Sequence, residues 1–360
     1  MTITTRKAVF SGLATLGVAA LLAGCASAPE EGGGSTDGAA APDFLPCIVS
    51  DSGGFDDKSF NQLGYEGLVE AADALGVDYK QVESATETDF APNITSLVDQ
   101  GCNLIVTVGF LLEEATTEAA AANPDVEFTI IDSSIEGENI KPIIFDTAQA
   151  AFLAGYAAAS YSKTGSVGTF GGMQIPTVTI FMDGFADGVA YFNEQKGTDV
   201  KVVGWDVASQ TGSFTGGFEA NEVAKSSAQG LIDQNVDVLL PVGGPIFLSA
   251  IEAIKDSGKD IAMIGVDADL VETSPDNASL FLTSILKQMK VGVADVVTAA
   301  AGGEFSNEPY VGTLENDGVG IAPFHDFESK VDPALADELE TIKAGIVDGS
   351  IPVESPSSPK

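Results

Sequence analysis

Short apolar runs alternate with segments of helical periodicity from Pro46 to the end of the chain. The runs are rich in Val, Ile and Phe, as expected of strands buried on both faces of a parallel sheet. A first series comprises Cys47–Ser50, Tyr79–Val82, Leu104–Val108, Phe128–Ile131 and Ile143–Phe145, and a second comprises Val167–Phe170, Lys201–Trp205, Val238–Pro241, Ala262–Val266 and Leu280–Thr283. Strand–helix alternation that divides near residue 150 predicts two doubly wound α/β lobes.

The helical segments between these runs have readable ends. Ser59 and Gln62 have the spacing of a capping box at the start of a helix. Gly76, Gly101 and Gly197 each follow a helical pattern and are predicted to end it, because glycine adopts the left-handed conformation of a helix C-terminus.

Polar and glycine residues collect where the predicted strands end. They are the segment DSGGFDDKSFN from Asp51 to Asn61, Asp132 with Ser133 and Ser134, Gly243 with Gly244, and Asp267 with Asp269. In open α/β sheets, ligands bind at the carboxyl ends of the strands. We therefore expect a crevice lined by carboxylates, glycine backbone and phenylalanines. Such a crevice suits a neutral, hydroxyl-rich ligand with a flat face.

Two plainer interpretations of the DSGGFDD segment stay open. It can be an ordinary strand-to-helix loop, in which glycines form turns and aspartate caps a helix. It can also be a calcium loop, although it lacks the ligand spacing of an EF-hand. The sequence contains no phosphate-binding glycine motif, and we expect no metal and no cofactor.

Composition narrows the class of protein further. The 360 residues carry 53 acidic and 16 basic side chains, a formal net charge of −37. This charge argues against nucleic-acid binding, which uses clustered Lys and Arg. Arg6 is the only arginine, so the guanidinium group usually used for phosphate is nearly lacking. His325 is the only histidine, which excludes a multi-histidine metal site and argues against a catalytic triad.

The N-terminus has the features of an export signal. Arg6 and Lys7 precede an apolar run, Ala8–Leu22, that is too short to span a bilayer comfortably. The run leads to Leu-Ala-Gly-Cys25, which resembles a bacterial lipobox. Residues 1–24 are thus expected to be a lipoprotein signal peptide, Cys25 the lipidated residue, and residues 25–43 a flexible tether. The folded part would be held at the extracytoplasmic face of the cell membrane.

Cys47 and Cys102 each lie at the start of an apolar run. If the two runs are neighbouring parallel strands, about 4.8 Å apart, the cysteines are within the range of a disulfide. We therefore predict a Cys47–Cys102 bridge, with a pair of buried thiols as the alternative.

Many segments resemble one known family. DSGGFDDKSFNQLGYEGL, LIVTVGFLLEEA, FTIID, TGSVGTFGGMQIPTVTIFMDGFADG, TGSFTGG, IGVDAD and LTSILKQMKVGV occur in the order typical of the basic membrane protein (BMP) family. Its members are PnrA-like substrate-binding lipoproteins of ABC transporters, and the resemblance covers nearly the whole chain after the tether.

The resemblance implies a type I periplasmic-binding-protein fold, in which two Rossmann-like lobes are joined by a three-strand hinge. It places residues 44–148 and 284–307 in an N-terminal lobe and residues 149–283 and 308–353 in a C-terminal lobe. It further implies a non-enzymatic protein that binds a purine nucleoside, such as adenosine, guanosine or inosine, and delivers it to an ABC permease and its ATPase.

The resemblance also implies roles for nine residues. Two aromatic rings would sandwich the purine, two carboxylates would bind the base edge, and three charged groups would hold the ribose or its surroundings. The two rings are Phe60 and Phe214, the two carboxylates at the base edge are Asp57 and Asp132, and the three charged groups are Asp51, Asp267 and Lys287. Asn61 and Gly244 are expected at ligand contacts or in loop shaping.

Two departures from the family pattern leave other interpretations open. The chain reads VGGPIF and DADLVETSPDN where relatives carry different loops. The same fold could therefore bind a sugar or another small neutral metabolite, or serve as a surface sensor without transport. An aspartate cluster with calcium would be compatible with a nucleoside hydrolase.

Overall fold

Two six-stranded sheets form the scaffold of residues 43–359, the part of the chain that the computed structural model describes. The predicted signal peptide, Cys25 and nearly all of the predicted tether lie outside these residues. No helix among the described residues has the length and apolar character needed to cross a bilayer.

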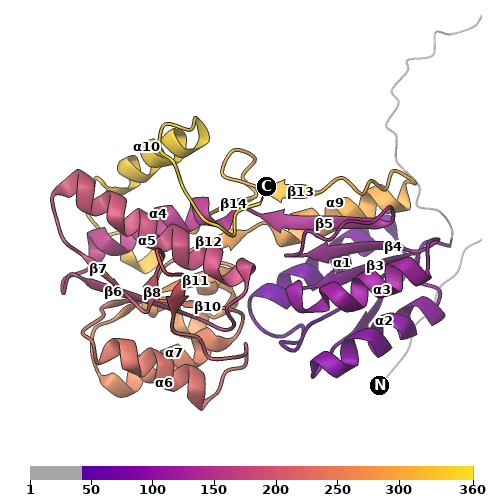
Figure 1. Cartoon of the computed structure of the whole chain (residues 1–360), viewed down its shortest axis with the longest axis horizontal. Helices are drawn as coiled ribbons and strands as arrows, with labels where there is room; N and C mark the ends of the chain where they lie inside the picture. The colour runs from indigo at the N-terminus through magenta and orange to yellow at the C-terminus, as the bar shows by residue number, and fades with distance from the viewer. Residues whose placement is uncertain (1–42, 360) are drawn as a thin grey trace, which may run out of the picture. The chain divides into compact units, whose positions relative to one another are not determined.

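The first sheet has the strand order β13-β5-β4-β3-β1-β2, and every pair in it is parallel. Its strands are β1 (Pro46–Val49), β2 (Lys80–Val82), β3 (Leu104–Val108), β4 (Glu127–Ile131), β5 (Ile140–Phe145) and β13 (Tyr310–Gly312). Helix α1 (Phe60–Leu75) packs beside α9 (Met289–Ala301), and α2 (Phe90–Asp99) beside α3 (Glu113–Ala122) (Figure 1).

The second sheet has the order β14-β12-β11-β10-β6-β7, with β14 antiparallel. Its strands are β6 (Ser166–Gly171), β7 (Lys201–Val203), β10 (Val238–Val242), β11 (Ala262–Asp267), β12 (Phe281–Lys287) and β14 (Val319–Ile321). Its helices are α4 (Thr147–Tyr161), α5 (Pro176–Lys196), α6 (Glu222–Ile232), α7 (Ile246–Ser257), α8 (Leu270–Thr273) and α10 (Leu335–Val347). A small hairpin, β8 (Trp205–Asp206) with β9 (Thr211–Gly212), follows β7.

Helices α4 and α5 pack side by side, so closely that their backbones are in contact. A Cβ atom on Gly155 would lie 2.1 Å from the carbonyl oxygen of Phe185, and one on Gly188 would lie 2.0 Å from that of Phe152. Only glycine permits this approach. The alanine-rich sequence of α4, nearly all of it buried, continues the same close packing.

The chain passes between the two sheets three times, as the type I fold requires. The passages run from β5 to α4, from β12 to α9 and from β13 to β14. The expected lobe boundaries differ in detail. Strand β12 stays in the second sheet as far as Lys287, and β13 belongs to the first sheet. The expected division instead places residues 284–287 in the N-terminal lobe and residues 308–312 in the C-terminal lobe.

Cys47 and Cys102 form a disulfide, with 5.9 Å between their Cα atoms. Cys47 lies in β1, and Cys102 comes just before β3, its parallel neighbour. The prediction from adjacent strands is thus confirmed, and the bridge lies at the amino-terminal edge of the first sheet.

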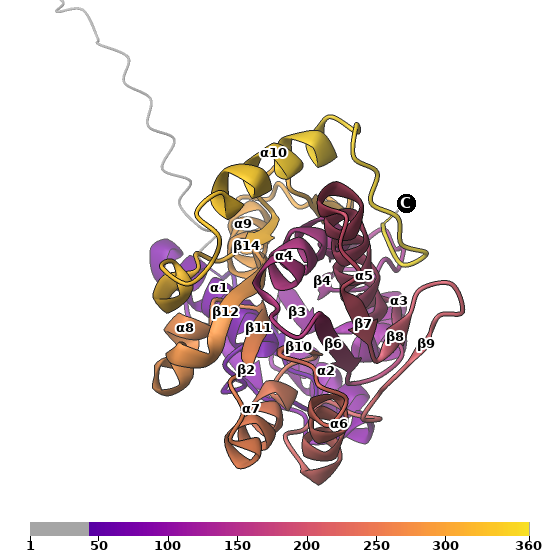
Figure 2. The same ribbon diagram turned by 90° about the vertical axis from the view of Figure 1, so that its left-hand side faces the viewer.

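The last residues of the described chain form a strap, residues 348–359, that follows α10 and runs along α5 (Figure 2). Three serine hydroxyls fasten it: Ser355 to Asp183 at 2.7 Å, Ser357 to Thr179 at 2.8 Å and Ser358 to Asp146 at 2.8 Å. Asp146 lies between β5 and α4, so the strap ends at one of the three passages between the sheets.

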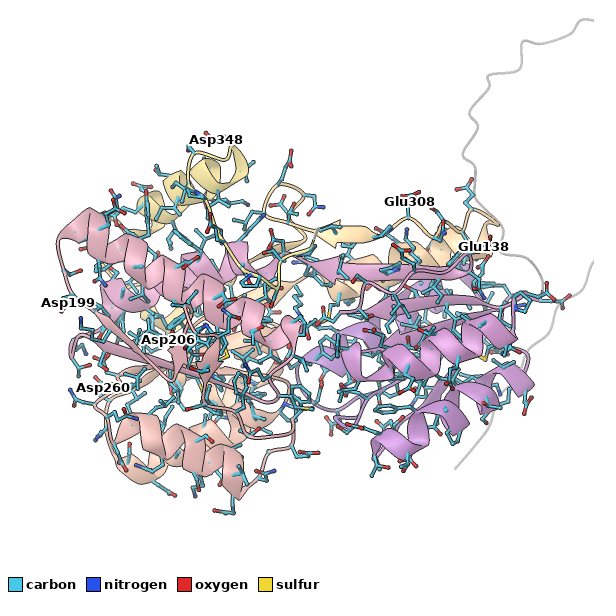
Figure 3. The ribbon with its side chains drawn as sticks, in the orientation of Figure 1. Glu138, Asp199, Asp206, Asp260, Glu308 and Asp348 are labelled. Carbon is cyan, nitrogen blue, oxygen red and sulfur yellow. A yellow bond between two sulfur atoms is a disulfide. The ribbon has the colours of Figure 1, made fainter. Side chains whose placement is uncertain are left out.

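The acidic residues lie mainly on the surface. The six that Figure 3 labels are exposed and occur on both lobes: Glu138, Asp199, Asp206, Asp260, Glu308 and Asp348. The large negative charge is therefore a property of the surface, which favours solubility and does not determine the fold.

Candidate functional site

A cavity of about 550 Å³ lies where strands of both sheets end. The first sheet contributes Asp51 after β1 and Asp132 after β4, and the second contributes Gly243 after β10, Asp267 at the end of β11 and Lys287 at the end of β12.

Eight of the nine residues singled out from the sequence line this cavity. They are Asp51, Asp57, Phe60, Asn61, Asp132, Gly244, Asp267 and Lys287. They come from segments as much as 236 residues apart, between Asp51 and Lys287, because strand ends of two sheets converge here.

The ninth residue, Phe214, does not line the cavity. Its ring packs edge-on against Trp205, with 5.9 Å between ring centroids, and covers Gly171. The expectation that Phe214 faces Phe60 across the cavity is wrong. Phe218, four residues further along the same loop, lines the cavity instead.

Asp57 caps helix α1. Its two carboxylate oxygens accept hydrogen bonds from the backbone N–H groups of Ser59, Asn61 and Gln62 at 2.8–3.1 Å. The predicted capping box of Ser59 and Gln62 is wrong, since the Ser59 hydroxyl makes no capping bond. It donates to the Val266 carbonyl and to Asp267 Oδ2, at 3.1 and 3.0 Å, both in the other lobe.

Asn61 joins Asp57 to Asp51. Its Nδ2 donates to Asp51 Oδ1 at 2.7 Å and to Asp57 Oδ2 at 3.1 Å, and its Oδ1 accepts from the Asp51 N–H at 3.2 Å. Asn61 is therefore committed to orienting two carboxylates. This arrangement makes it a positioning residue for Asp51.

Asp51 keeps one oxygen available. Oδ1 also accepts from the Gly53 N–H at 3.0 Å, whereas Oδ2 has no hydrogen-bond partner among the described residues. Burial raises the pKa of Asp51 to about 6, because water no longer solvates its charge. The cavity thus contains a carboxylate oxygen that is buried and free to accept a hydrogen bond.

Lys287 bridges two carboxylates. Its Nζ lies 2.6 Å from Asp132 Oδ2 and 3.5 Å from Asp267 Oδ1, and the rings of Phe60 and Phe181 lie 5.3 and 5.0 Å from it. Burial opposes the lysine charge, but the two carboxylates outweigh burial and hold the pKa of Lys287 above its usual value. The Lys287–Asp132 pair joins the two lobes.

The cavity has excess negative charge. With Asp51, Asp57, Asp132 and Asp267 ionised and Lys287 protonated, its lining carries a formal charge of −3. Lys287 is the only cation among the described lining residues, and it is already paired with Asp132 and Asp267. The site is therefore complementary to hydroxyl and N–H donors and opposes anions.

Sequence reasoning missed three aromatic residues of the cavity: Phe110, Phe181 and Phe218. Phe110 follows Gly109 just after the end of β3, a position that could have revealed it. Phe181 lies on a buried, apolar stretch of α5, and such a position is typical of core packing. Phe218 gave no signal in the pattern, because Thr215, Gly216 and Gly217 separate it from the TGSF segment.

Comparison with known proteins gives a consistent result. Residues 45–354 match the family model described as "ABC transporter substrate-binding protein PnrA-like". The "ABC transporter nucleoside-binding protein BmpA" of Lactococcus lactis subsp. cremoris is 30% identical over 354 residues, 93% of this chain and 95% of that protein. The "CD4+ T-cell-stimulating antigen" of Listeria monocytogenes is 30% identical, over 86% and 88% of the two chains.

Among solved structures, an ABC transporter solute-binding protein from Aeropyrum pernix K1 superposes with a TM-score of 0.77 at 25% identity. The match covers 87% of this chain and 94% of that one. A glucose-galactose-binding protein from Geobacillus stearothermophilus has a TM-score of 0.56 at 13% identity, which indicates a shared fold only.

Proposed function

This chain belongs to the PnrA-like (BMP) family of ABC-transporter substrate-binding proteins, and from that premise we propose that it binds a purine nucleoside between its two lobes. Proteins of this class bind a ligand outside the cytoplasm and are not enzymes, so the hydrolase alternative is set aside. The unassigned part is the ligand, and the chemistry of the cavity supports a nucleoside.

The observation that carries the proposal is the combination of aromatic rings with a free, buried carboxylate oxygen. Phe60 and Phe218 line the same cavity as Asp51 Oδ2. A planar base can stack on an aromatic ring, and ribose hydroxyls donate well to a carboxylate. A sugar alone would donate hydrogen bonds to the carboxylate but has no planar base to stack on the aromatic rings.

In the proposed complex, Phe60 stacks on the base, and Asp51 and Asp267 accept hydrogen bonds from the ribose. Asp132 accepts from the base edge, while Lys287 balances Asp132 and Asp267. Asp57 and Asn61 act indirectly by orienting Asp51, and Gly244 shapes the loop after β10. The name of the Lactococcus lactis relative, which calls that protein nucleoside-binding, agrees with this assignment.

Calorimetry on protein that has been unfolded, dialysed and refolded, so that co-purified ligand is removed, tests the proposal. We expect inosine, guanosine or adenosine to bind, and ribose, glucose and galactose to bind at least tenfold more weakly. Nucleoside 5′-monophosphates should bind at least a hundredfold more weakly, because placing like charges together costs several kcal/mol. Sugar binding without nucleoside binding would refute the assignment.

We further propose that Cys25 carries the lipid anchor and that the ligand is passed to an ABC permease and its ATPase. The lipobox residues before Cys25 support the anchor. Intact-mass analysis of membrane-extracted protein should show the acyl groups, and Cys25→Ala should release the protein from membranes. A deletion strain should lose uptake of labelled nucleoside, whereas a sensor without transport would leave uptake unchanged.

A further inference from the structure

We propose that Gly172 and Gly243 form a seat for the ring of Phe218 and thereby determine which planar bases the cavity accepts. The inference rests on the proposed nucleoside function and extends it to two residues that themselves offer no side chain. Gly172 directly follows β6, and Gly243 directly follows the neighbouring strand β10.

The two glycines meet the ring of Phe218 at contact distance. A Cβ atom on Gly172 would lie 2.4 and 2.5 Å from Phe218 Cδ1 and Cε1, and one on Gly243 would lie 2.6 and 2.8 Å from the same atoms. Real Cβ atoms do not approach carbon so closely. The ring thus occupies space that exists only because both strand ends lack side chains.

The strand ends are fixed to each other. The Gly172 N–H donates to the Val242 carbonyl at 2.9 Å, and Val242 pairs with Gly171 in the sheet. The seat is therefore part of the rigid sheet and cannot widen to accommodate an added methyl group.

The loop that carries Phe218 is also fixed. The Thr215 N–H donates to the Gly171 carbonyl at 3.0 Å, and the Gly216 N–H donates to the Gly172 carbonyl at 2.8 Å. Gly217 O lies only 2.8 Å from the Cβ position of Gly172, so the backbone before Phe218 would be displaced as well. A methyl group at Gly172 must therefore move the ring away from its present position on the cavity wall.

Moving the ring changes selectivity whichever way it goes. A ring pushed into the cavity leaves less space for a two-ring base, and a ring pushed out removes a stacking surface. A purine loses more than a pyrimidine in both cases, because it is larger and stacks over a larger area. Selectivity between purine and pyrimidine nucleosides is therefore the informative measurement.

Gly172→Ala is the test variant, since Gly172 lacks the left-handed backbone of Gly243, whose φ is 135°. Its control is Gly230→Ala, on the exposed surface of α6, where an added Cβ meets nothing within 4 Å. We expect Gly172→Ala to lower inosine affinity at least tenfold and the inosine-to-uridine affinity ratio at least threefold. Gly230→Ala should change neither.

A double variant links the effect to the ring. Gly172→Ala combined with Phe218→Ala should bind inosine no more weakly than Phe218→Ala alone, because the added methyl then meets no ring. An unchanged affinity ratio in Gly172→Ala, or additive losses in the double variant, would overturn the proposal. If wild-type protein binds inosine normally in those experiments, the nucleoside function stands while the seat does not.

Failure of wild-type protein to bind any nucleoside would instead overturn the proposed function and this inference with it. Thermal unfolding, compared with that of Gly230→Ala, shows whether Gly172→Ala folds. If it does not fold, it is replaced by two variants that keep both glycines, Phe218→Leu and Phe218→Trp. The inosine-to-uridine ratio must then change at least threefold in both variants, and an unchanged ratio would contradict the proposal.

Discussion

Asp132 and Asp267 hold Lys287 from opposite lobes and from equivalent positions of the two sheets. Asp132 follows β4 and Asp267 ends β11, each the third strand in the order of its sheet. Both residues have left-handed backbone, with φ of 63° and 67°. This conformation is uncommon for residues other than glycine. The duplicated geometry turns both carboxylates toward one lysine.

Replacing Lys287 with methionine should strongly destabilise the protein. The substitution keeps the apolar stem and leaves two buried carboxylates without their cation, which costs about 3–5 kcal/mol. Urea unfolding followed by circular dichroism measures the loss. Lys343→Met is the control, because its partner Asp317 is exposed and water can solvate the carboxylate that remains, so stability should change far less. Equal stabilities of the two variants would contradict the bridging role of Lys287.

Nucleoside affinity should fall on acidification through pH 6. Burial raises the pKa of Asp51 to about 6, and a ligand hydroxyl that donates to Asp51 requires the ionised form. Each pH unit below this value should weaken binding by up to about tenfold, as measured by calorimetry from pH 5 to 8. Asp51→Asn should bind weakly with little dependence on pH.

The effect of Asp51 on folding has the opposite sign. Its pKa in the folded protein lies above the ordinary aspartate value of 3.8, so its ionisation costs more in the folded state. Its contribution to the free energy of unfolding therefore falls as pH rises from about 4 to 6. Burial also raises the pKa of Asp187 to about 6, and Asp187 lies beside the strap. Nucleoside binding by Asp187→Asn should still depend on pH. If this variant lost the pH dependence, Asp187 and not Asp51 would be the group that titrates.

Asp57→Ala should destabilise helix α1 and weaken binding indirectly. The variant leaves the N–H groups of Ser59, Asn61 and Gln62 without their acceptor, a loss of about 1–3 kcal/mol. Hydrogen exchange should become faster at those amides in ligand-free protein. Asp57→Asn keeps one acceptor oxygen and should recover part of the stability. Unchanged exchange would mean that Asp57 does not hold the helix start.

Phe60→Ala should weaken nucleoside binding by about 1–3 kcal/mol, by analogy with base stacking on aromatic side chains. Phe214→Leu should change affinity less than twofold, because Phe214 packs on Trp205 outside the cavity. Calorimetry on the two variants compares the predicted and the observed aromatic positions. A larger loss in Phe214→Leu would restore the role that the sequence suggested for it.

The ten strands predicted from apolar runs all overlap strands of the structure, because a buried parallel strand needs a continuous apolar segment. Strands β9, β13 and β14 have only two or three residues and were missed, and the predicted run Lys201–Trp205 merged β7 with the start of β8. The left-handed helix ends at Gly76 and Gly197 were predictable, since a local backbone requirement specifies glycine there.

The sequence was less informative about side-chain directions. Ser59 has the spacing of a capping residue, yet its hydroxyl bonds across the lobes to a residue 208 positions away, and Asp57 takes its place. Phe214 and Phe218 share one loop, and the turn at Gly216 and Gly217 determines which ring reaches the cavity. Contacts between distant segments decided both cases, and local patterns contain no information about such contacts.

The position of the strap matters for anyone who labels this protein. Ser358 bonds to Asp146, so the last part of the strap lies next to a passage between the lobes. A purification tag or fluorescent protein fused after it would be close to the pivot of any lobe movement. Such a fusion could report ligand capture through a change in its signal, whereas equilibrium constants are better measured on protein from which the fusion has been cleaved.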